Sequence, residues 1–310
     1  MSPPAVDVAV VVVTYNSADV LPGLLDSLAD GLSGLSWHLV VADNDSSDDV
    51  ASRALDLVPG CTVVRMGRNA GYAAGLNAGV GAAPPHRAVL VLNPDVRLEP
   101  GCVARLLDAL DRSGAGIAVP RLADSGGHLH LSMRREPTVL RALGDAVMGA
   151  RRAGRWSRLG ELVTDPGAYD HPATPDWAEG STQLISARCW QTCGGWDESF
   201  FLYSEETEYG LRARDAGYAT AYVPDARATH LQGDSTTSPG LWALLVANRV
   251  RLHRRRHGWL SGTVFWAVTV AREASRTALG RATSRAALQM LTSPRRMRES
   301  PGPHTVAWNG

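Results

Sequence analysis

The stretch Val8-Ala9-Val10-Val11-Val12-Val13-Thr14 is an unbroken run of small and β-branched apolar residues near the amino terminus. A run of this kind predicts a strand that is buried on both faces, as in a parallel sheet. The polar pair Asn16-Ser17 follows and can cap a helix. The apolar residues after it recur at helical spacing, at Val20, Leu21, Leu24, Leu25 and Leu28. The chain therefore opens with a predicted strand followed by a predicted helix.

The same alternation continues as far as residue 119. Further strands are predicted at residues 37–42, 61–66, 88–92 and 116–119, and helices at residues 50–57, 70–80 and 100–112. Strands that alternate with helices indicate an α/β fold, with a Rossmann-like, mostly parallel sheet flanked by helices.

The second half of the chain has a weaker pattern. Residues 121–175 show little periodicity, which predicts a long loop. Strands are predicted at residues 182–186 and 219–223, and helices at residues 187–193, 205–216 and 241–256. A helical extension is expected after these elements, and the tail beyond residue 293 is expected to be disordered.

Composition excludes several classes of function. The formal net charge of the 310 residues is zero, which argues against a nucleic-acid partner. The absence of lysine excludes the phosphate-binding loop motif and Schiff-base catalysis. The four cysteines lack paired zinc-binding spacing. The amino terminus does not have the features of a signal peptide, and the uncharged residues 259–271 are too few to span a bilayer. A cytoplasmic protein is expected.

Two acidic elements are candidates for chemistry. Asp95 lies in Asn93-Pro94-Asp95, directly after the strand at residues 88–92, where open α/β sheets bind ligands. Glu205, Glu206 and Glu208 stand in the first turn of a predicted helix. The helix dipole stabilises acids at that position, and this is an alternative explanation for them.

Polar residues also follow the first three predicted strands. Asp43 and Asp45 lie just past the second strand, where an acid can bind a nucleobase or ribose. Helix capping would explain Asp45 but leaves Asp43 unused. The segment from Asn69 to Asn77 is rich in glycine and alanine, which permits either close approach of a ligand or tight helix packing. The dinucleotide-binding pattern GxGxxG is absent from the sequence.

In this order, the elements resemble family 2 glycosyltransferases, which are inverting enzymes of the GT-A fold. Within that family the chain looks most like the bacterial rhamnosyltransferases of cell-wall and polysaccharide assembly. The resemblance covers roughly residues 7–257. It implies a GT-A domain at 1–257, with a nucleotide-binding half at 7–119 and an acceptor and catalytic half at 120–257. An amphipathic helical extension at 258–293 and a disordered tail at 294–310 would follow.

The resemblance also implies roles for individual residues. The nucleotide-sugar would be bound by Thr14, Asn16, Asp43, Asp45, Asn69, Gly71, Asn77, Asn93, Asp95 and Arg249. A divalent cation, Mg²⁺ or Mn²⁺, would be held by Asp95 and by His230 of the segment His230-Leu231-Gln232-Gly233-Asp234-Ser235. Asn93 stands where many GT-A enzymes carry a first aspartate. The acceptor would meet Glu179, Gly180 and Ser181, although Glu179 could equally be a surface carboxylate.

Glu206 matches the general base of the family. The usual residue is aspartate, which is one methylene shorter, and Glu205 is therefore an alternative base. The implied reaction moves a sugar, with rhamnose from dTDP-rhamnose as the expected case, to a hydroxyl of a glycan, a lipid-linked saccharide or a small molecule. Two other functions stay open. One is a nucleotidyltransferase, although residues 14–25 contain no basic loop for a triphosphate. The other is a non-catalytic module that binds sugar nucleotides or glycans.

Arginines dominate the charge beyond residue 248. Arg254, Arg255 and Arg256 precede the uncharged segment that contains Trp259 and Trp266. Such a segment can lie in a membrane interface, or it can dock on the catalytic domain. The first alternative would place the protein at the inner face of the plasma membrane and would suit a lipid-linked acceptor.

Overall fold

The computed structural model describes residues 5–231 and 238–307. Within these ranges the strands are β1 Val6–Thr14, β2 Trp37–Asp43, β3 Thr62–Arg65, β4 His86–Leu92, β5 Val96–Leu98, β6 Ile117–Ala123, β7 Leu129–His130, β8 Met133–Arg134, β9 Trp177–Ala178, β10 Thr182–Ser186 and β11 Thr220–His230. The helices are α1 Leu21–Gly31, α2 Val50–Leu57, α3 Tyr72–Ala82, α4 Cys102–Ser113, α5 Val139–Met148, α6 Ala150–Ala153, α7 Ala187–Cys193, α8 Glu205–Asp215, α9 Pro239–Ala278, α10 Ala282–Thr292, α11 Pro294–Arg298 and α12 Pro303–Val306.

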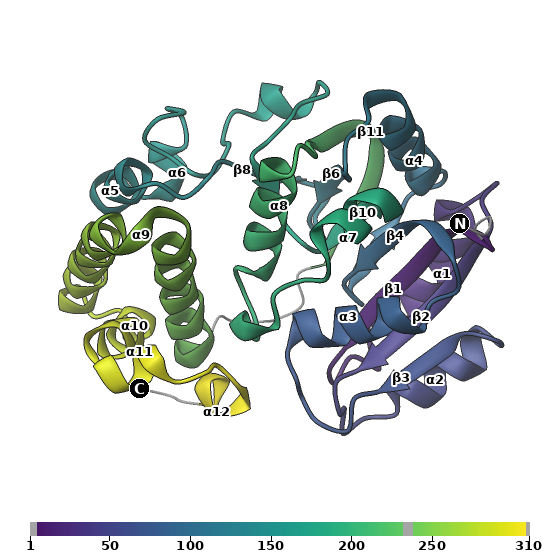
Figure 1. Cartoon of the computed structure of the whole chain (residues 1–310), viewed down its shortest axis with the longest axis horizontal. Coiled ribbons are helices and arrows are strands. Elements are labelled where there is room, and N and C mark those ends of the chain that lie inside the picture. Colours follow the sequence, from purple (N-terminus) through teal and green to yellow (C-terminus); the bar gives the residue numbers. More distant parts are fainter. Residues whose placement is uncertain (1–4, 232–237, 308–310) are drawn as a thin grey trace.

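One large sheet organises the first two thirds of the chain, in the order β3-β2-β1-β4-β10-β6-β11-β5 (Figure 1). The β3-β2-β1-β4 half is parallel throughout, and β11 is parallel to β6. Strand β10 is antiparallel to both β4 and β6. The predicted α/β fold with a mostly parallel sheet is therefore confirmed.

Strand β1 lies at the centre of the core because both of its faces are apolar. Val8, Val10 and Val12 belong to one hydrophobic cluster, and Val11 and Val13 belong to another. Successive side chains of a strand point to opposite faces, so the valine run supplies both layers at once. Helices α1, α2 and α4 cover the first face, and α3, α7 and α8 contribute to the second. This packing explains why the run contains no polar residue.

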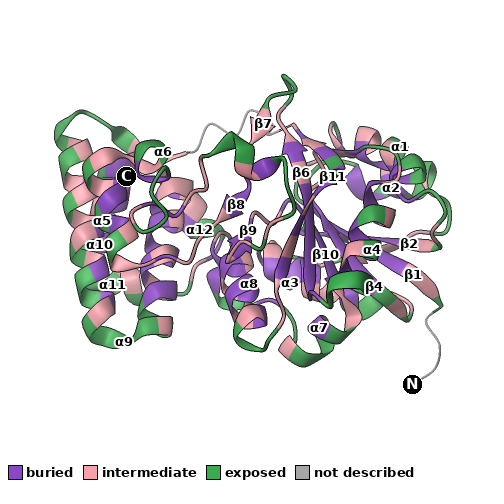
Figure 2. Ribbon diagram, turned by 90° about the horizontal axis from the view of Figure 1, so that it is seen from above, coloured by how far each residue is buried: buried purple, intermediate pink, exposed green. Residues whose placement is uncertain are grey.

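The C-terminal helices form a third hydrophobic cluster beside the sheet. Side chains of α5, α9 and α10 pack together there, and Figure 2 shows these helices gathered at one side of the molecule. Helix α9 is interrupted at Gly258, whose φ of 77° favours glycine. After the break, Phe265 is buried in the cluster while Trp259 and Leu260 are exposed. None of the described helices is long and apolar enough to cross a membrane.

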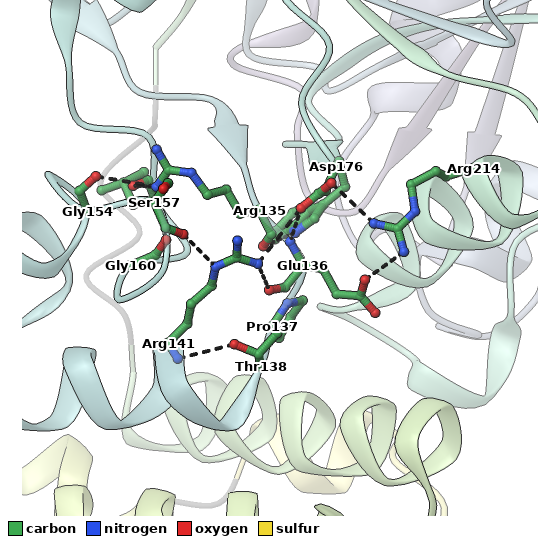
Figure 3. Close-up of polar contacts among 12 residues, drawn as sticks. Arg135, Glu136, Pro137, Thr138, Arg141, Gly154, Ser157, Gly160, Asp176 and Arg214 are labelled. Atoms are coloured by element: carbon green, nitrogen blue, oxygen red, sulfur yellow. Dashed lines mark hydrogen bonds and ion pairs between the residues drawn. The ribbon is translucent and has the colours of Figure 1, made fainter.

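The segment at residues 121–175 is more ordered than the sequence predicts. It contains α5, capped by the Thr138 side chain, which accepts a hydrogen bond from the Arg141 backbone nitrogen at 3.2 Å. Arg214 of α8 ties the segment down through Glu136 at 2.6 Å and Asp176 at 3.2 Å (Figure 3). The large residues Leu140, Leu143 and Val147 of α5 recur at helical spacing but are exposed, so this face of the helix lies outside the core.

Two other expectations need correction. Strand β11 continues to His230 instead of ending at residue 223, since a bulge between Val223 and Arg227 accommodates Pro224. The predicted disorder beyond residue 293 is wrong for residues 294–307, which contain α11 and α12. Arg251 anchors this tail by donating to the backbone oxygens of Arg296, Met297 and Glu299 at 3.1 to 3.3 Å.

Candidate active site

Asp95 and His230 meet at the edge of the sheet. Asp95 follows β4, and His230 is the last residue of β11, where it pairs with Val96 of β5. The Leu231 backbone nitrogen donates to the Asp95 backbone oxygen at 3.0 Å. The imidazole Nε2 of His230 lies 3.3 Å from Asp95 Oδ1. The antiparallel pairing of β5 and β11 thus brings together two residues that are far apart in the sequence. Residues Gln232 to Ser235 of the motif that begins at His230 lie outside the described residues.

Glu179 and His130 complete this cluster. Glu179 Oε1 lies 3.2 Å from His230 Nδ1, and Glu179 Oε2 lies 2.5 Å from His130 Nε2. One ligand atom from each of His130, Glu179 and His230 lies within 4.8 Å of the others. His130 is not among the predicted site residues, because the segment around it was predicted to be a loop. The alternating His128-Leu129-His130 pattern was the one available signal.

The charges in this cluster perturb one another. Burial would lower the pKa of His230, but hydrogen bonds to Asp95 and Glu179 raise it to about 9. Burial would raise the pKa of Glu179, but hydrogen bonds from His130 and His230 hold it well below its usual range. Glu179 and His230 are therefore each stabilised in the charged form by their neighbours.

The cluster has the donor atoms that a divalent cation requires. Carboxylate oxygens and imidazole nitrogens are common ligands of such ions. His230 Nδ1 is buried and lies 3.2 Å from Glu179 Oε1. A bound cation would replace the proton that the neighbouring acids stabilise on this imidazole, because a ligating imidazole is neutral. The residues present thus fit a divalent ion held by Asp95, His230, Glu179 and His130.

Glu205 and Glu206 begin helix α8 and differ in exposure. Glu205 is 3% exposed, whereas Glu206 is partly exposed. Burial raises the pKa of Glu206 to about 7, and burial together with the neighbouring Glu206 raises the pKa of Glu205. Glu206 is thus the carboxylate of this pair that solvent or a substrate can reach.

The loop before these acids is strained and held from one side. Phe201, Tyr203 and Ser204 all have positive φ, between 64° and 77°. Such values are unfavourable for residues other than glycine and persist only where the surroundings fix them. The Asn248 side-chain nitrogen of α9 donates to the backbone oxygens of Phe200, Leu202 and Tyr203 at 2.8 to 3.1 Å. Asn248 therefore holds the loop that positions Glu205 and Glu206.

Two glycines join the neighbouring segments to this loop. A Cβ atom on Gly180 would lie 3.1 Å from the Cβ atom of Glu206, so Gly180 packs directly against that acid. A Cβ atom on Gly71 would lie 2.4 Å from the Phe201 backbone oxygen, and φ at Gly71 is 94°. The Tyr72 backbone nitrogen donates to the same oxygen at 2.8 Å. The predicted donor-binding segment therefore contacts the loop before α8, and the predicted acceptor-binding segment contacts the first turn of α8.

The ends of β1 and β2 offer unpartnered polar atoms. Thr14 Oγ1 and Asn44 Oδ1 are buried without a hydrogen-bond partner. Asp43 accepts a hydrogen bond from the Ser46 backbone nitrogen at 3.1 Å, and Asn16 accepts one from Ser47 at 2.8 Å. Asp45 is exposed, with φ of 66°. The Asn44 amide donates to the Gly71 backbone oxygen at 2.9 Å, which connects this edge to the segment that packs against Phe201.

Asn69, Asn93 and Ser181 lie within this connected set. Asn69 accepts a hydrogen bond from the Gly71 nitrogen at 3.1 Å, and Asn93 accepts one from the Tyr72 hydroxyl at 3.0 Å. The Asn93 backbone nitrogen donates to the Ser181 oxygen at 2.9 Å. The hydroxyl of Ser181 is buried and unpartnered. Burial, followed by the charges of Glu205, Glu206 and Asp95, raises the pKa of Tyr72, which places that phenol among all three acids.

Two of the predicted residues have other partners in the structure. The Asn77 amide exchanges hydrogen bonds of 2.9 Å with the backbone of Trp196 and also contacts Glu198, so it fastens α3 to the turn before α8. Arg249 pairs with Glu161 and lines a small cavity with Asp145 and Arg272 among the C-terminal helices. The Asn77 side chain is thus engaged by protein groups, and Arg249 lies among the C-terminal helices with Glu161 as its partner.

Comparison with known proteins gives consistent matches. The family model described as glycosyl transferase family 2 matches residues 9–164. A relative from Mycobacterium tuberculosis, N-acetylglucosaminyl-diphospho-decaprenol L-rhamnosyltransferase, is 30% identical over 278 residues, which cover 83% of this chain and 87% of the relative. The low-salt glycan biosynthesis hexosyltransferase Agl10 of Haloferax volcanii is 28% identical over 67% of this chain and 62% of its own length.

Solved structures show the same fold at lower identity. The mannosyltransferase PcManGT from Pyrobaculum calidifontis, in complex with GDP-Man and Mn²⁺, has a TM-score of 0.54 and 16% identity, and the match covers 95% of this chain and 83% of that one. GalNAc-T7 with UDP, GalNAc and Mn²⁺ has a TM-score of 0.56 and 15% identity, over 80% of this chain and 47% of that one. These likenesses confirm the predicted GT-A fold.

Proposed function

Since this chain belongs to glycosyltransferase family 2, we propose that it transfers rhamnose from dTDP-rhamnose to a hydroxyl of a lipid-linked saccharide, with inversion. The observation that carries this proposal is the position of Glu206. It is partly exposed, it packs against Gly180, and it shares the neighbourhood of Tyr72 with Asp95. The proposed base for the acceptor thus lies against the segment that carries Glu179, one of the proposed ligands of the cation.

On the donor side, the polar ends of β1 and β2 would bind the nucleotide. Thr14 and Asn44 have buried oxygen atoms without partners, and Asp43 is 5% exposed beside them. A divalent cation, when bound, supplies positive charge that stabilises the nucleoside diphosphate as it leaves. Asp95, His230, Glu179 and His130 would hold that ion. The two solved structures with Mn²⁺ support this role for a cation.

On the acceptor side, Glu206 would remove the proton of the attacking hydroxyl. The acceptor oxygen forms a bond to the anomeric carbon on the face opposite the diphosphate, the bond to the diphosphate oxygen breaks, and the proton passes to Glu206. The raised pKa of Glu206, about 7, suits a base that must accept a proton near neutral pH. Glu205 is buried and would act on Glu206 through its charge. Gly180 and Ser181 would line the acceptor position.

The choice of sugar and acceptor is supported by the relatives. The name of the Mycobacterium tuberculosis relative contains both rhamnose and a lipid-linked diphospho-sugar acceptor. The exposed side chains Trp259, Leu260 and Val264 form an apolar surface on α9, preceded by Arg254 and Arg255. Basic and apolar groups together suit peripheral contact with an anionic membrane, where such an acceptor would reside.

A donor screen tests the proposal. The purified chain is incubated with Mn²⁺, an acceptor sugar on a prenyl diphosphate, and in turn dTDP-rhamnose, UDP-GlcNAc or GDP-mannose, while nucleoside diphosphate release is measured. We expect release with dTDP-rhamnose and a glycosidic product whose anomeric configuration is opposite to that of the donor.

Other results would contradict it. Release of pyrophosphate from a nucleoside triphosphate would identify a nucleotidyltransferase instead. Binding of a sugar nucleotide without any turnover, either by transfer or by slow hydrolysis, would identify a non-catalytic module.

A further inference from the structure

A groove with a volume of about 740 Å³ lies in the C-terminal helical region. Its walls come from both arms of α9, on either side of Gly258, and from the end of α10 and α11. The site proposed above for donor and acceptor sugar contributes no residue to its lining. We call it the arginine groove, after Arg251, Arg254, Arg255 and Arg298, which line it.

The arginine groove carries positive charge that the protein does not neutralise. Its lining includes four arginines and no carboxylate. Arg254 and Arg298 are exposed and make no ion pair or hydrogen bond with any described residue. Arg251 is partly buried and donates only to the Asn248 side chain and to backbone oxygens of the tail, within the described ranges. Three of the four guanidinium groups therefore lack an acidic partner, which favours an anionic ligand.

The rest of the lining is apolar. Val250, Trp266, Leu291 and Met297 contribute carbon surface to the same groove. The turn of α9 that lines the groove with Gly262 and Thr263 also exposes Leu260 and Val264 to solvent. A ligand that fills the groove would thus combine an anionic head with an apolar tail.

Direct contacts join the arginine groove to the loop before α8. Arg251 donates to Asn248 Oδ1 at 2.8 Å, and the amide nitrogen of Asn248 holds the backbone oxygens of Phe200, Leu202 and Tyr203. Arg255 donates to Asp197 and to Ser199, both at 2.9 Å, and lies over the Phe200 ring. An anion in the groove would therefore lie one side chain away from the segment that positions Glu206.

We propose that the arginine groove binds the phosphate or diphosphate head, and the first apolar part, of the lipid that carries the acceptor sugar. This inference rests on the function proposed above, because it assigns the lipid of that acceptor. The planar guanidinium groups suit phosphate oxygens, and the groove volume exceeds that of a phosphate group alone. A membrane phospholipid shares the same chemistry, and the experiment distinguishes the two.

The first test measures binding without catalysis. Farnesyl diphosphate, farnesol and inorganic diphosphate are titrated into the full chain by calorimetry, with EDTA present so that no cation recruits diphosphate to Asp95 and His230. We expect farnesyl diphosphate to bind at least about tenfold more tightly than either other probe, since it alone uses both the arginines and the apolar wall.

The matched variants locate this binding. The double variant R254Q/R298Q removes two unpartnered charges from the groove and should weaken farnesyl diphosphate binding at least about tenfold. The double variant R281Q/R285Q removes the same charge from exposed positions on α10 and its cap, outside the groove, and should not. Equal weakening by both pairs, or farnesyl diphosphate binding no tighter than farnesol, would overturn the proposal.

The second test uses transfer. Wild type and R254Q/R298Q are compared on one acceptor sugar attached either to a prenyl diphosphate or to a short alkyl chain. The ratio of kcat/KM for the two acceptors should fall about tenfold or more in the groove variant, through KM. An unchanged ratio would overturn the proposal. If wild type transfers to neither acceptor while the binding results hold, the proposed function fails and the groove assignment stands as a prenyl diphosphate site.

Vesicles separate the two lipid sources. Co-sedimentation with phosphatidylglycerol vesicles should fall no further in R254Q/R298Q than in R281Q/R285Q, because the groove serves a single lipid diphosphate and Arg254 adds only general attraction to the anionic membrane. Loss of vesicle binding in that variant, with farnesyl diphosphate binding retained, would show that the groove serves membrane phospholipid instead.

Discussion

Two buried groups of charged side chains differ in how their charges are balanced. The sheet-edge cluster consists of Asp95, His130, Glu179, His230, Glu205 and Glu206. The helical charge cluster consists of Asp145, Glu161, Arg249, Arg272, Glu273 and Arg276. Both combine carboxylates with cationic or basic side chains, and both lie largely away from solvent.

In the helical charge cluster, arginines match the acids. Arg249 pairs with Glu161, and Arg272 lies 3.3 Å from Glu273, with Arg276 at 3.9 Å from the same acid. The Trp242 indole also donates to Glu273 at 3.0 Å. Three arginines thus face three acids, with Asp145 as the third. A buried cluster balanced in this way needs no ligand to be stable.

In the sheet-edge cluster, acids outnumber fixed cations. Four carboxylates face two histidines, and Arg134 approaches Glu179 only to 4.0 Å. Burial first, and then the neighbouring carboxylates, raise the pKa values of Glu205 and Glu206. A buried cluster with an excess of negative charge is therefore a candidate functional site. A bound cation and a transferred proton would supply the missing positive charge.

The largest test of this contrast replaces Glu206, the partly exposed acid. Glu206→Gln should lower kcat by about 10²–10⁴, because the acceptor hydroxyl loses its base, while the melting temperature falls little or not at all. Transfer is measured as nucleoside diphosphate release, and folding by circular dichroism. Glu208→Gln is the control, because Glu208 lies in the same turn and pairs with Arg212 at 2.9 Å. A larger loss in Glu205→Gln than in Glu206→Gln would make Glu205 the base.

A second test removes one partner from the balanced cluster. Glu273→Gln should destabilise the fold by about 3–5 kcal/mol, since Arg272 and Arg276 would then be buried without compensation. Urea denaturation measures the change, and turnover per folded molecule should be retained. Glu299→Gln, which removes an exposed pair with Arg295, should cost less than about 1 kcal/mol. Similar losses in both variants would show that the helical charge cluster is not a structural unit.

A third test addresses the cation. With Mn²⁺ and dTDP, each well above its dissociation constant, wild type should gain about 2–3 kcal/mol of stability, and EDTA should remove the gain. Asp95→Ala should lose this cation-dependent gain, whereas Asp145→Asn in the helical charge cluster should keep it. Thermal denaturation with and without the metal provides the measurement. A gain that survives in Asp95→Ala would exclude Asp95 as a ligand.

The smallest expected effect is on how the free energy of unfolding depends on pH. The pKa of Glu206 is about 7 in the folded chain, above the ordinary glutamate value of 4.5. The folded state therefore holds the proton more tightly, and the stability that this provides is complete below pH 4.5 and lost as pH rises through 7. Glu206→Gln cannot ionise, so it should be more stable than wild type at pH 8, by about 1–3 kcal/mol, and equal to it near pH 4.5. Equal stability of wild type and Glu206→Gln across this pH range would show that folding does not raise the pKa of Glu206.

Much of the sheet could be predicted because its signals are local. The valines of β1 belong to two cores, so their uninterrupted run predicts a buried strand directly. Asp95 was recognisable because it follows such a strand. Glu206 was recognisable because it begins a helix after a glycine-rich turn. In each case a few adjacent residues contain the whole pattern.

The parts that could not be predicted depend on contacts between distant segments. His130 joins the cluster through Glu179, which lies 49 residues further along the chain. The Asn77 amide is engaged by Trp196, 119 residues away, so its interpretation as a donor ligand could not be checked from spacing. The order in residues 294–307 depends on Arg251 of α9. No local pattern in these segments identifies the distant residue that each of them contacts.

The contact of Gly71 with Phe201 also limits how this enzyme can be redesigned. Any side chain at residue 71 would collide with the backbone of the loop, and the Tyr72 nitrogen is bonded to the same carbonyl. The segment that would select the sugar nucleotide and the segment that would carry the base are therefore packed together and cannot change independently. A chimera that imports a new donor specificity would have to exchange both segments together, although they are widely separated in the gene.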